Sequence, residues 1–318
     1  MIKLALKRSG SALLVLLGVT VIVFMLLQLV PGDPARAILG QGATEQAVAN
    51  LREELGLNAS LVSQYFSYLG DLVGGDFGTS ISQGVPVMEI LAPKLGNTAI
   101  LAAAALLIAV VIGVPLGVIA GSRQHSLFDR IAMALSLGGA SIPVYWAALV
   151  VVAAFSLGLG WFPTGGMYNA REPGGFADLL SHLVLPAAIA ALVPLAVIAR
   201  LTRAQVIDAL SGDYVTVLRA SGISTRSILW KHVLRNVLPS LVGIIGLQVG
   251  YLLGGVIFVE VVFQWPGLGQ QLYASITAND LPIVQAGVLF VAAAFVAINL
   301  LSDLLVAALN PRVRSSLS

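Results

Sequence analysis

The chain alternates between long apolar stretches and shorter polar ones. Six stretches have uncharged centres and are long enough, or nearly so, to cross a bilayer, which takes about 20 residues of α-helix. The fourth is the weakest, because its uncharged core at 183–199 must borrow from its flanks. The pattern predicts an all-α membrane protein with a single transmembrane domain over 1–318. The six predicted spans are about 9–30, 97–121, 131–157, 183–203, 237–259 and 281–305.

Composition agrees with this pattern. The 318 residues are 58% hydrophobic and 10% charged, with a mean hydropathy of +0.95, whereas a soluble domain has about 25% charged residues. The chain has no cysteine, which excludes disulfides, thiolate metal sites and cysteine nucleophiles. His125, His182 and His232 are far apart in the sequence, so we expect them to be loop or interface residues rather than metal ligands.

Lysine and arginine predict the orientation. If the N-terminus is inside, the internal segments carry thirteen of these residues and the external segments carry four, which is the positive-inside asymmetry. We therefore expect both termini in the cytoplasm. The internal residues are Lys3, Lys7, Arg8, Arg123, Arg130, Arg200, Arg203, Arg219, Arg226, Lys231, Arg235, Arg312 and Arg314. The external ones are Arg36, Arg52, Lys94 and Arg171.

Two further features concern the first span and the segment after it. The basic Met1–Arg8 stretch resembles a signal peptide, but the length of the first span favours an uncleaved signal-anchor. The extracytoplasmic segment 31–94 is too long for a tight turn, and 45–57 and 60–75 show helical periodicity. These helices could lie along the membrane surface, meet an extracellular partner or pack as a small cap on the bundle.

A polar interruption at 204–239 separates the fourth and fifth spans, and its 204–236 part is predicted to be a cytoplasmic loop. Within it a short helix is expected over 213–221. One face of this helix would carry Tyr214, Val217, Leu218 and Ser221. A compact, half-apolar helix facing water indicates docking against a partner protein.

The ends of this helix carry capping signals. Asp213 is expected to be the N-cap, and Gly222 is expected to take the left-handed conformation after the last turn. Ser224 can cap a second helix that runs towards Arg235, before Pro239 marks the entry into the fifth span.

Glycines recur every four residues on two of the spans. Gly246, Gly250 and Gly254 lie on the fifth span, and Gly113 and Gly117 lie on the second. Small residues at this spacing allow close helix packing in membranes. We therefore interpret both sets as packing surfaces.

Two acidic residues lie at span ends. Glu260, amid apolar neighbours, is expected to accept hydrogen bonds from the backbone amides of Gly267 and Gly269 and so to fix a re-entrant segment at the outer mouth. An outer gate and a purely structural turn are both open at this point. Asp303, at the inner end of the sixth span, is expected to make an ion pair or a hydrogen bond with cytoplasmic-side groups such as Arg200 or Arg203.

Several catalytic signatures are missing. The sequence contains no GxxxxGK, HExxH or GxSxG motif, so the chain cannot build a phosphate-binding P-loop, and we expect neither catalytic residues nor a metal site. Ion-coupled carriers usually place an ionisable group near the membrane midplane, yet these spans are uncharged through their middles. A transport route of this kind needs its energy from another chain.

The whole chain resembles the inner-membrane permease subunits of binding-protein-dependent ABC importers for dipeptides, oligopeptides and, in some members, nickel. The resemblance rests on an ordered set of segments, which together are far more specific than any one of them. In family order they are LVPGDPARAILG (29–40), LREELGL (51–57), GDFGTSISQGVPVMEIL (75–91), GVPLGVIAG (113–121), SIPVYWAAL (141–149), DYVTVLRASGIS (213–224), FQWPGLG (263–269), DLPIVQ (280–285) and NPRVR (310–314).

By this resemblance, 213–222 corresponds to the coupling segment of the family's EAA loop, which inserts into a groove of the cytoplasmic ATPase subunit. Counting back from Gly222, this chain has Thr216, Val217 and Leu218 where the generic pattern has Glu-Ala-Ala, so an acidic contact is not expected. The peptide-permease version of the pattern is met by Asp213, Tyr214, Arg219, Ala220 and Gly222.

The same resemblance implies that the outer turn borders the translocation path near the docked binding protein. Its residues are Glu260, Trp265, Pro266, Gly267 and Gly269. The implied fold is that of a type I ABC importer permease in the bacterial or archaeal plasma membrane.

The implied partners are a second homologous permease, a substrate-binding protein, the lipid bilayer, and two ATP-binding subunits (or one fused or homodimeric ATPase) that hold ATP and Mg²⁺. No cofactor on this chain and no nucleic acid are expected. A permease for nickel or another small solute, an ion-coupled secondary transporter or channel, and a membrane-embedded enzyme are the alternatives. The last two lack the intramembrane ionisable site, the clear inverted repeat or the catalytic residues that they would need.

Overall fold

The computed structural model describes residues 2–29, 34–40, 42–54, 56–169, 171–172 and 174–309. Residues 31–33 of the PGDP segment and the whole of 310–314, with Arg312 and Arg314, lie outside this described part. The described residues are mostly helical, and their only β-pairing is an isolated bridge between Thr79 and Pro86. The predicted all-α fold class is therefore confirmed.

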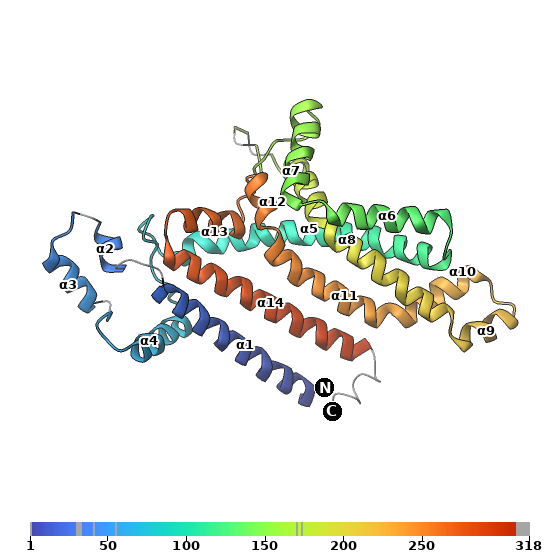
Figure 1. Cartoon of the computed structure of the whole chain (residues 1–318), viewed down its shortest axis with the longest axis horizontal. Coiled ribbons are helices and arrows are strands. Elements are labelled where there is room, and N and C mark those ends of the chain that lie inside the picture. Colours follow the sequence, from blue (N-terminus) through green and yellow to red (C-terminus); the bar gives the residue numbers. More distant parts are fainter. Residues whose placement is uncertain are drawn as a thin grey trace.

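The helices fall into an outer group, a set of long apolar helices and a cytoplasmic group (Figure 1). The outer helices are α2 (Pro34–Leu39), α3 (Glu45–Glu54), α4 (Leu61–Gly74), α12 (Ile257–Val262) and α13 (Leu268–Thr277). The long helices are α1 (Ile2–Leu29), α5 (Val87–Ser122), α8 (Phe176–Leu210), α11 (Leu234–Gly255) and α14 (Leu281–Leu309). The cytoplasmic helices are α9 (Asp213–Ala220), α10 (Thr225–Ser227) and the π-helical η2 (Ile228–Val233).

Five described helices are long and apolar enough to cross a membrane, and a bent pair brings the number to six if it counts as one span. The five are Arg8–Leu26, Val87–Ser122, Phe176–Leu210, Thr225–Gly255 and Leu281–Ala308. The weak fourth span does borrow from its flanks, because α8 extends from Phe176 to Leu210.

The third predicted span is not one straight helix. The stretch divides into α6 (Leu127–Ser141) and α7 (Val144–Val151), which continues into the π-helical η1 (Val152–Gly158), and the two parts meet at an angle of 97°. Ile142 is extended and Pro143 follows it. A residue before proline disfavours the α conformation, and proline has no N–H for the next turn. The Ile142–Pro143 pair therefore accounts for the bend, which hydropathy alone did not predict.

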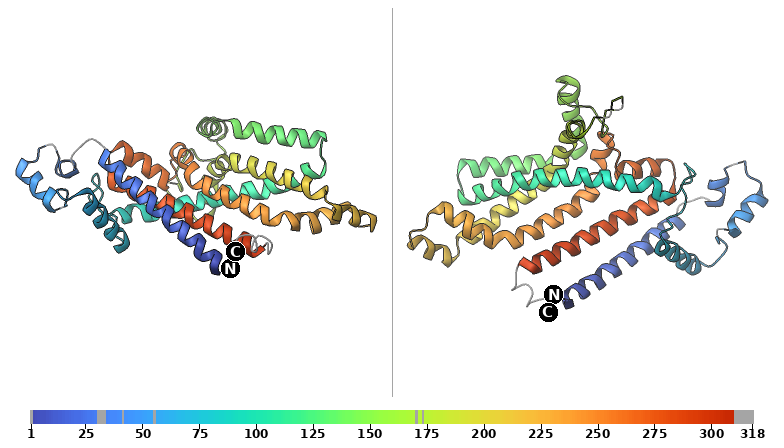
Figure 2. Two further views of the ribbon diagram at one scale, coloured as in Figure 1. Left: turned by 60° about the horizontal axis from the view of Figure 1, so that its bottom comes forward. Right: turned by 180° about the vertical axis from the view of Figure 1, so that it is seen from behind.

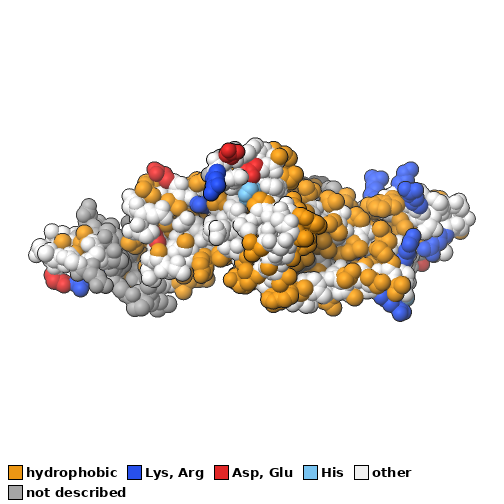
Figure 3. All heavy atoms as spheres, turned by 90° about the horizontal axis from the view of Figure 1, so that it is seen from above, with side chains coloured by type: hydrophobic (Ala, Val, Ile, Leu, Met, Phe, Trp, Pro, Cys, Tyr) orange, Lys and Arg blue, Asp and Glu red, His pale blue; other side chains and the backbone are white. Residues whose placement is uncertain are grey.

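The arrangement of the elements agrees with the predicted orientation. The start of α1, the α5–α6 turn, α9 and α10 lie towards one end of the helix bundle, and α2, α3, α4 and α13 lie towards the other (Figures 1 and 2). Seen from above, most blue side chains gather at the end that holds α9 and α10 (Figure 3). Lys and Arg therefore mark the cytoplasmic end.

Ion pairs near this end differ from the expected ones. Asp303 pairs with Arg8 at 2.8 Å, so the predicted cytoplasmic-side ion pair is present, but its partner is Arg8 and neither of the two arginines named as examples. Arg203 instead makes a two-pronged interaction with Asp129 of α6, with Nη2 donating to Oδ2 at 2.7 Å. The Arg8–Asp303 pair joins the start of α1 to the end of α14, two helices that run side by side (Figure 2).

Helices α5 and α8 pack extensively against each other, and glycines make their close approach possible. A Cβ on Gly117 would overlap the carbonyl oxygen of Ala199, and one on Gly121 would lie 2.9 Å from that of Arg203. Gly113 is tight as well, at 3.1 Å from the Leu195 oxygen. The second-span glycine stripe therefore extends to Gly121, a member that was not predicted from the sequence.

The fifth-span stripe is correct for two of its three members. A Cβ on Gly246 would overlap Ser302 Oγ, and one on Gly250 would lie 2.6 Å from the Phe295 ring, so both glycines let α11 approach α14. Gly254 has nothing within 4 Å of such a Cβ. Gly254 therefore makes no close helix contact with the described part of this chain, and its packing role stays a prediction.

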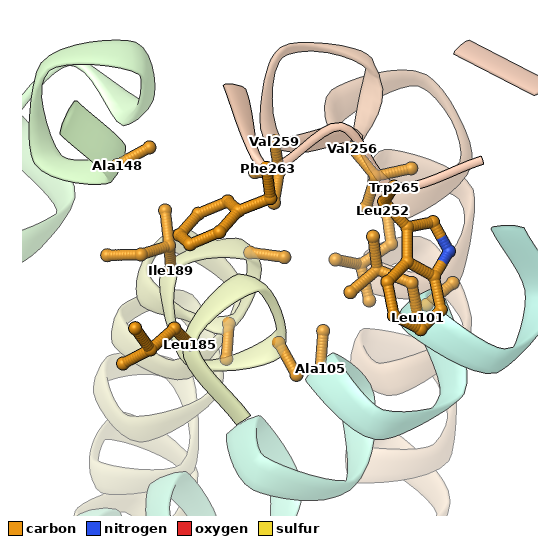
Figure 4. Close-up of a cluster of buried hydrophobic side chains, with 14 of the residues drawn as sticks. Leu101, Ala105, Ala148, Leu185, Ile189, Leu252, Val256, Val259, Phe263 and Trp265 are labelled. Atoms are coloured by element: carbon orange, nitrogen blue, oxygen red, sulfur yellow. The ribbon is translucent and has the colours of Figure 1, made fainter. Parts of the chain in front are cut away.

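The largest apolar cluster lies towards the outer half of the bundle, where α5, α7, α8, α11 and α12 meet (Figure 4). Trp265 and Phe263, from the turn after α12, point into it. Both are almost fully buried. The apolar cluster thus holds the Phe263 and Trp265 side chains in the interior, whereas Gln264 between them is exposed.

Candidate functional site

Two regions collect the residues that the sequence singles out: α9 at the cytoplasmic end and the turn between α12 and α13 at the outer end. Helix α9 begins at Asp213, and its N-cap is Gly212 rather than the predicted Asp213. Asp213 is the first residue of the helix, where a negative charge still complements the helix dipole.

The C-terminal end of α9 is a Schellman motif. Gly222 has φ +75°, its N–H donates to the Arg219 carbonyl at 3.0 Å, and the N–H of Ile223 donates to that of Leu218 at 3.2 Å. The predicted left-handed glycine is confirmed. Ser224 also caps the next helix as predicted, because its Oγ accepts from the N–H of Ser227.

One side of α9 packs against the rest of the protein. Val215 is fully buried with Val118 of α5 and Val206 of α8. Leu218, three residues after Val215, is half-buried on the same cluster. This cluster, completed by residues of η2 and α11, ties α9 to the ends of the long helices. The role of Val215 was not predicted from the sequence, because helical spacing alone does not say which apolar face turns inward.

The other side of α9 faces solvent. Val217 is 63% exposed and Tyr214 is 38% exposed. The Tyr214 ring lies over Gly212, where a Cβ would come within 3.0 Å of the ring. The predicted face of Tyr214, Val217, Leu218 and Ser221 is thus divided, because Leu218 belongs partly to the interior.

A groove runs beside this exposed face. Its volume is about 860 Å³, and its lining includes Tyr214 and Ile223 together with Lys231, His232 and Arg235 of η2 and the start of α11. Arg219 and Ala220 at the end of α9 are exposed as well. The arrangement offers an apolar ridge on a basic rim, a surface suited to a protein partner rather than to catalysis.

At the outer end, Glu260 holds the turn between α12 and α13 together. Its carboxylate accepts from the N–H of Gly269 at 2.6 Å, from the N–H of Gln270 at 3.1 Å and from the hydroxyl of Thr98 at 2.6 Å. The predicted bond from Gly269 is confirmed. The predicted bond from Gly267 is wrong, because that N–H donates to the Trp265 carbonyl.

The glycines of the turn are required by space. A Cβ on Gly267 would overlap Glu260 Oε1, and one on Gly269 would lie 2.7 Å from the Cα of Ile257. Gly267 therefore matters because it has no side chain to collide with the Glu260 carboxylate, and not because it donates a hydrogen bond to it. Its backbone lets the carboxylate lie directly against the turn.

Reciprocal hydrogen bonds fasten the turn to α5. The indole Nε1 of Trp265 donates to the Asn97 carbonyl at 2.9 Å, and the Asn97 side chain donates to the Pro266 carbonyl at 2.9 Å. Thr98 also accepts from the N–H of Leu268 at 2.8 Å. Asn97 and Thr98 were not predicted from the sequence, although two adjacent polar residues at the start of a long apolar run are a usable signal.

Burial and hydrogen bonding act in opposite directions on Glu260. Burial raises the pKa of its carboxyl above the ordinary value, while the hydrogen bonds from Thr98, Gln270 and Gly269 and the charge of Lys94 partly offset the rise. Trp265 and Glu260 are both fully buried. The turn is therefore held rigidly by buried hydrogen bonds in this conformation. Its role as an outer gate stays a prediction.

A second buried carboxylate with its own set of hydrogen-bond donors was not predicted from the sequence. The Asp280 carboxylate accepts from the hydroxyls of Ser80 at 2.5 Å and Ser82 at 2.6 Å, and from the N–H groups of Ser82 at 3.0 Å and Ile81 at 3.2 Å. Asp280 immediately precedes α14. It thus fastens the segment before α5 to the start of the last span, across about 200 residues of sequence.

Family models match nearly the whole chain. Residues 113–315 match the binding-protein-dependent transport system inner membrane component, and residues 1–102 match the N-terminal part of such membrane components. The chain belongs to this family. It is accordingly a multi-pass inner-membrane component of a binding-protein-dependent transport system.

Relatives extend the match over the full length. The chain is 38% identical to the dipeptide transport system permease protein DppB of Alkalihalophilus pseudofirmus, with 99% of this chain and 100% of that one covered. It is 34% identical to the Escherichia coli DppB, with 99% of both covered. It is also 40% identical to a putative peptide transport system permease protein of Brucella abortus, again with 99% of both covered.

Solved structures support the fold. An inward-facing form of the MetNI methionine ABC transporter superposes with a TM-score of 0.58 at 19% identity, covering 70% of this chain and 97% of that one. At that identity the likeness shows the fold alone, and it confirms the predicted importer-permease fold.

Proposed function

We propose that this chain forms half of the translocation path of an ATP-driven importer for dipeptides and oligopeptides. The observation that carries the proposal is the full-length similarity to permeases that are named for dipeptide and peptide transport. A second, homologous permease would supply the other half of the path. A permease for nickel or another small solute is not favoured, because these relatives are named for peptides.

In this proposal the chain has no catalytic residue, and ATP is hydrolysed by two partner subunits that hold ATP and Mg²⁺. A substrate-binding protein delivers the peptide from outside. Energy reaches the path through α9, whose exposed Tyr214 and Val217 dock into an ATPase groove while Arg219 lies at the rim. Because Val215 and Leu218 fasten α9 to α5, α8 and α11, movement of the ATPase would be passed to these helices and rock them between inward-facing and outward-facing states.

The turn between α12 and α13, which Glu260 and Trp265 fasten to α5, would close the path at its outer end. Its hydrogen bonds join α5, α12 and α13, so these three elements would move as one block. Gating would then come from displacement of this block, not from opening of the buried Glu260 site itself.

Reconstitution into liposomes tests the proposal. The chain is purified with the second permease, the ATPase subunits and the binding protein of its own transport system, and uptake of a labelled dipeptide is followed with and without ATP. The expected result is uptake that needs ATP and the binding protein. Dipeptide uptake by this chain alone under an ion gradient would overturn the proposal in favour of a secondary transporter. Uptake of Ni²⁺ but not dipeptide by the full assembly would overturn the substrate assignment.

A further inference from the structure

Helix α4 in the outer segment presents three different faces. The first packs on α1: the Tyr65 hydroxyl and Thr20 Oγ1 are 2.9 Å apart, and the Phe24 ring contacts Tyr65 edge-on at 5.4 Å and stacks on Tyr68 at 5.8 Å. Since the Thr20 hydroxyl also bonds the Leu17 carbonyl, Tyr65 is the donor of the pair. This face fixes α4 against the outer half of α1.

The second face of α4 is apolar and uncovered. Val62, Phe66 and Val73 are 66%, 65% and 90% exposed, and their spacing puts them on one side of the helix. The third face is polar and exposed, with Ser63, Ser67 and Asp71. A helix with one protein-facing, one apolar and one polar side has the pattern expected at a boundary between protein, lipid and water.

The depth of the contact on α1 decides what covers the apolar face. Arg8 begins the spanning part of α1, which ends at Leu26, and it pairs with Asp303 at the cytoplasmic end. At about 1.5 Å per residue, Thr20 and Phe24 lie roughly 18 and 24 Å further along. The hydrocarbon core is about 30 Å thick. The contact with α4 is therefore inside the outer half of the membrane.

Contacts at the outer end of α1 agree with this depth of α4 in the membrane. Gln28 of α1 lies two residues beyond the span, and its side chain is 3.4 Å from that of Gln64, the residue before Tyr65. The neighbours of Phe24 on α1, including Ile22 and Met25, are 60% and 48% exposed, as lipid-facing residues of a span are. Both views in Figure 2 place α4 beside the outer end of α1.

We infer that α4 is sunk into the outer leaflet, with Val62, Phe66 and Val73 in contact with lipid acyl chains and Ser63 and Ser67 turned to the water. The apolar face continues the lipid-facing surface of α1 and carries no charge, whereas the polar face would be costly in hydrocarbon. The occupant is thus the bilayer and not an extracytoplasmic protein. The helix would anchor the whole outer segment at a fixed depth.

The absence of cysteine from the chain permits a direct test. Single-cysteine variants V62C, F66C and V73C, with S63C and S67C as matched controls, are spin-labelled in the complete transporter. The complexes are reconstituted in vesicles of phosphatidylethanolamine and phosphatidylglycerol. Collision rates are then measured with oxygen, which concentrates in lipid, and with a water-soluble nickel chelate.

The expected result is that oxygen exceeds the nickel chelate at positions 62, 66 and 73, and that the order reverses at 63 and 67. Access of the nickel chelate to 62, 66 and 73 would overturn the inference, because the apolar face would then be in water. Exclusion of both reagents from these three positions would also overturn it, because a protein partner would then cover the face. Three independent apolar positions keep the test decisive if one variant assembles poorly.

Discussion

The hydroxyl of Thr98 donates to the carboxylate of Glu260 at 2.6 Å and so joins α5 to α12 across 162 residues of sequence. We predict that Thr98→Val destabilises the protein by about 2 kcal/mol, because a hydrogen bond to a charged group is lost and a buried acceptor is left less satisfied. Thermal unfolding in detergent measures the change. Thr98→Ser keeps the hydroxyl and is the control. Equal loss of stability in both variants would mean that packing of the methyl group, and not the hydrogen bond, matters.

Glycine substitutions separate close packing from mere spacing. Gly117→Ala should lower stability by roughly 1–3 kcal/mol, because its methyl group would overlap the Ala199 carbonyl oxygen. Gly254→Ala should be neutral or stabilising by up to about 1 kcal/mol, since nothing lies near and alanine favours helix. Unfolding midpoints of the two variants test this difference. Equal effects would contradict the packing role of Gly117.

The cluster around Asp280 predicts a specific dependence on pH. Burial raises the pKa of Asp280, but the hydrogen bonds from Ser80, Ser82 and Ile81 outweigh it, so the pKa lies below the ordinary value of 3.8. The stabilisation is therefore complete above about pH 4 and is lost as the pH falls through the lowered pKa. Hydrogen exchange of 78–86 should be unchanged between pH 5 and 8, after correction for intrinsic exchange rates.

Replacement of Asp280 should loosen the attachment of the 78–86 segment at neutral pH. Asp280→Asn puts an amide N–H₂ among four donors and should weaken the attachment by about 2 kcal/mol, with faster exchange at 78–86. Glu89→Gln, which neutralises an exposed carboxylate in the first turn of α5, is the control for loss of charge. Faster exchange in the control alone would contradict the role given to Asp280.

An ion pair fixes the first turn of α6 to α8. The Asp129 side chain is 3% exposed and that of Arg203 is 25% exposed. Arg203→Ala should therefore destabilise the protein by about 3 kcal/mol, because an almost buried carboxylate loses its partner. The double variant with Asp129→Ala should recover part of that loss. Additive losses in a double-mutant cycle would show that the two residues act independently.

The sequence predicted the features that depend on local pattern. Hydropathy and the distribution of Lys and Arg predicted the spans and agree with the arrangement of the ends, and the capping signals at Gly222 and Ser224 were correct. Gly269 beside Glu260 could also be predicted, because a buried acid needs donors and the turn supplies them nearby. These relations involve residues close together in the chain.

Relations between distant residues could not be predicted. Asp303 pairs with Arg8 and Asp129 with Arg203, choices that depend on how the helices are arranged. The inward side of α9 was assigned incompletely, because Val215 and Val217 are both apolar and only the packing of α5, α8 and α11 selects Val215. The bend at Ile142–Pro143 is a local signal, but proline occurs inside several of these long helices without ending them.

The exposed face of α9 is the central element of the proposed function. Val217→Asp places a charge on its apolar ridge and leaves the buried Val215 contact intact. If this ridge docks into an ATPase groove, binding should weaken by about 2 kcal/mol or more, as for other interface anchors, which is roughly 30-fold. Leu218→Asp is less informative, because Leu218 also packs on the internal cluster.

The most direct measurement is therefore ATP-dependent dipeptide uptake by proteoliposomes that contain V217D, compared with T216D. Thr216 is exposed on the same helix but lies on a different side from Tyr214 and Val217. The T216D variant therefore adds the same charge to α9 outside the proposed docking face. We predict that V217D inserts into the membrane normally but loses most of its uptake, while T216D keeps it. Undiminished uptake by V217D at normal expression would contradict the role of α9 in coupling.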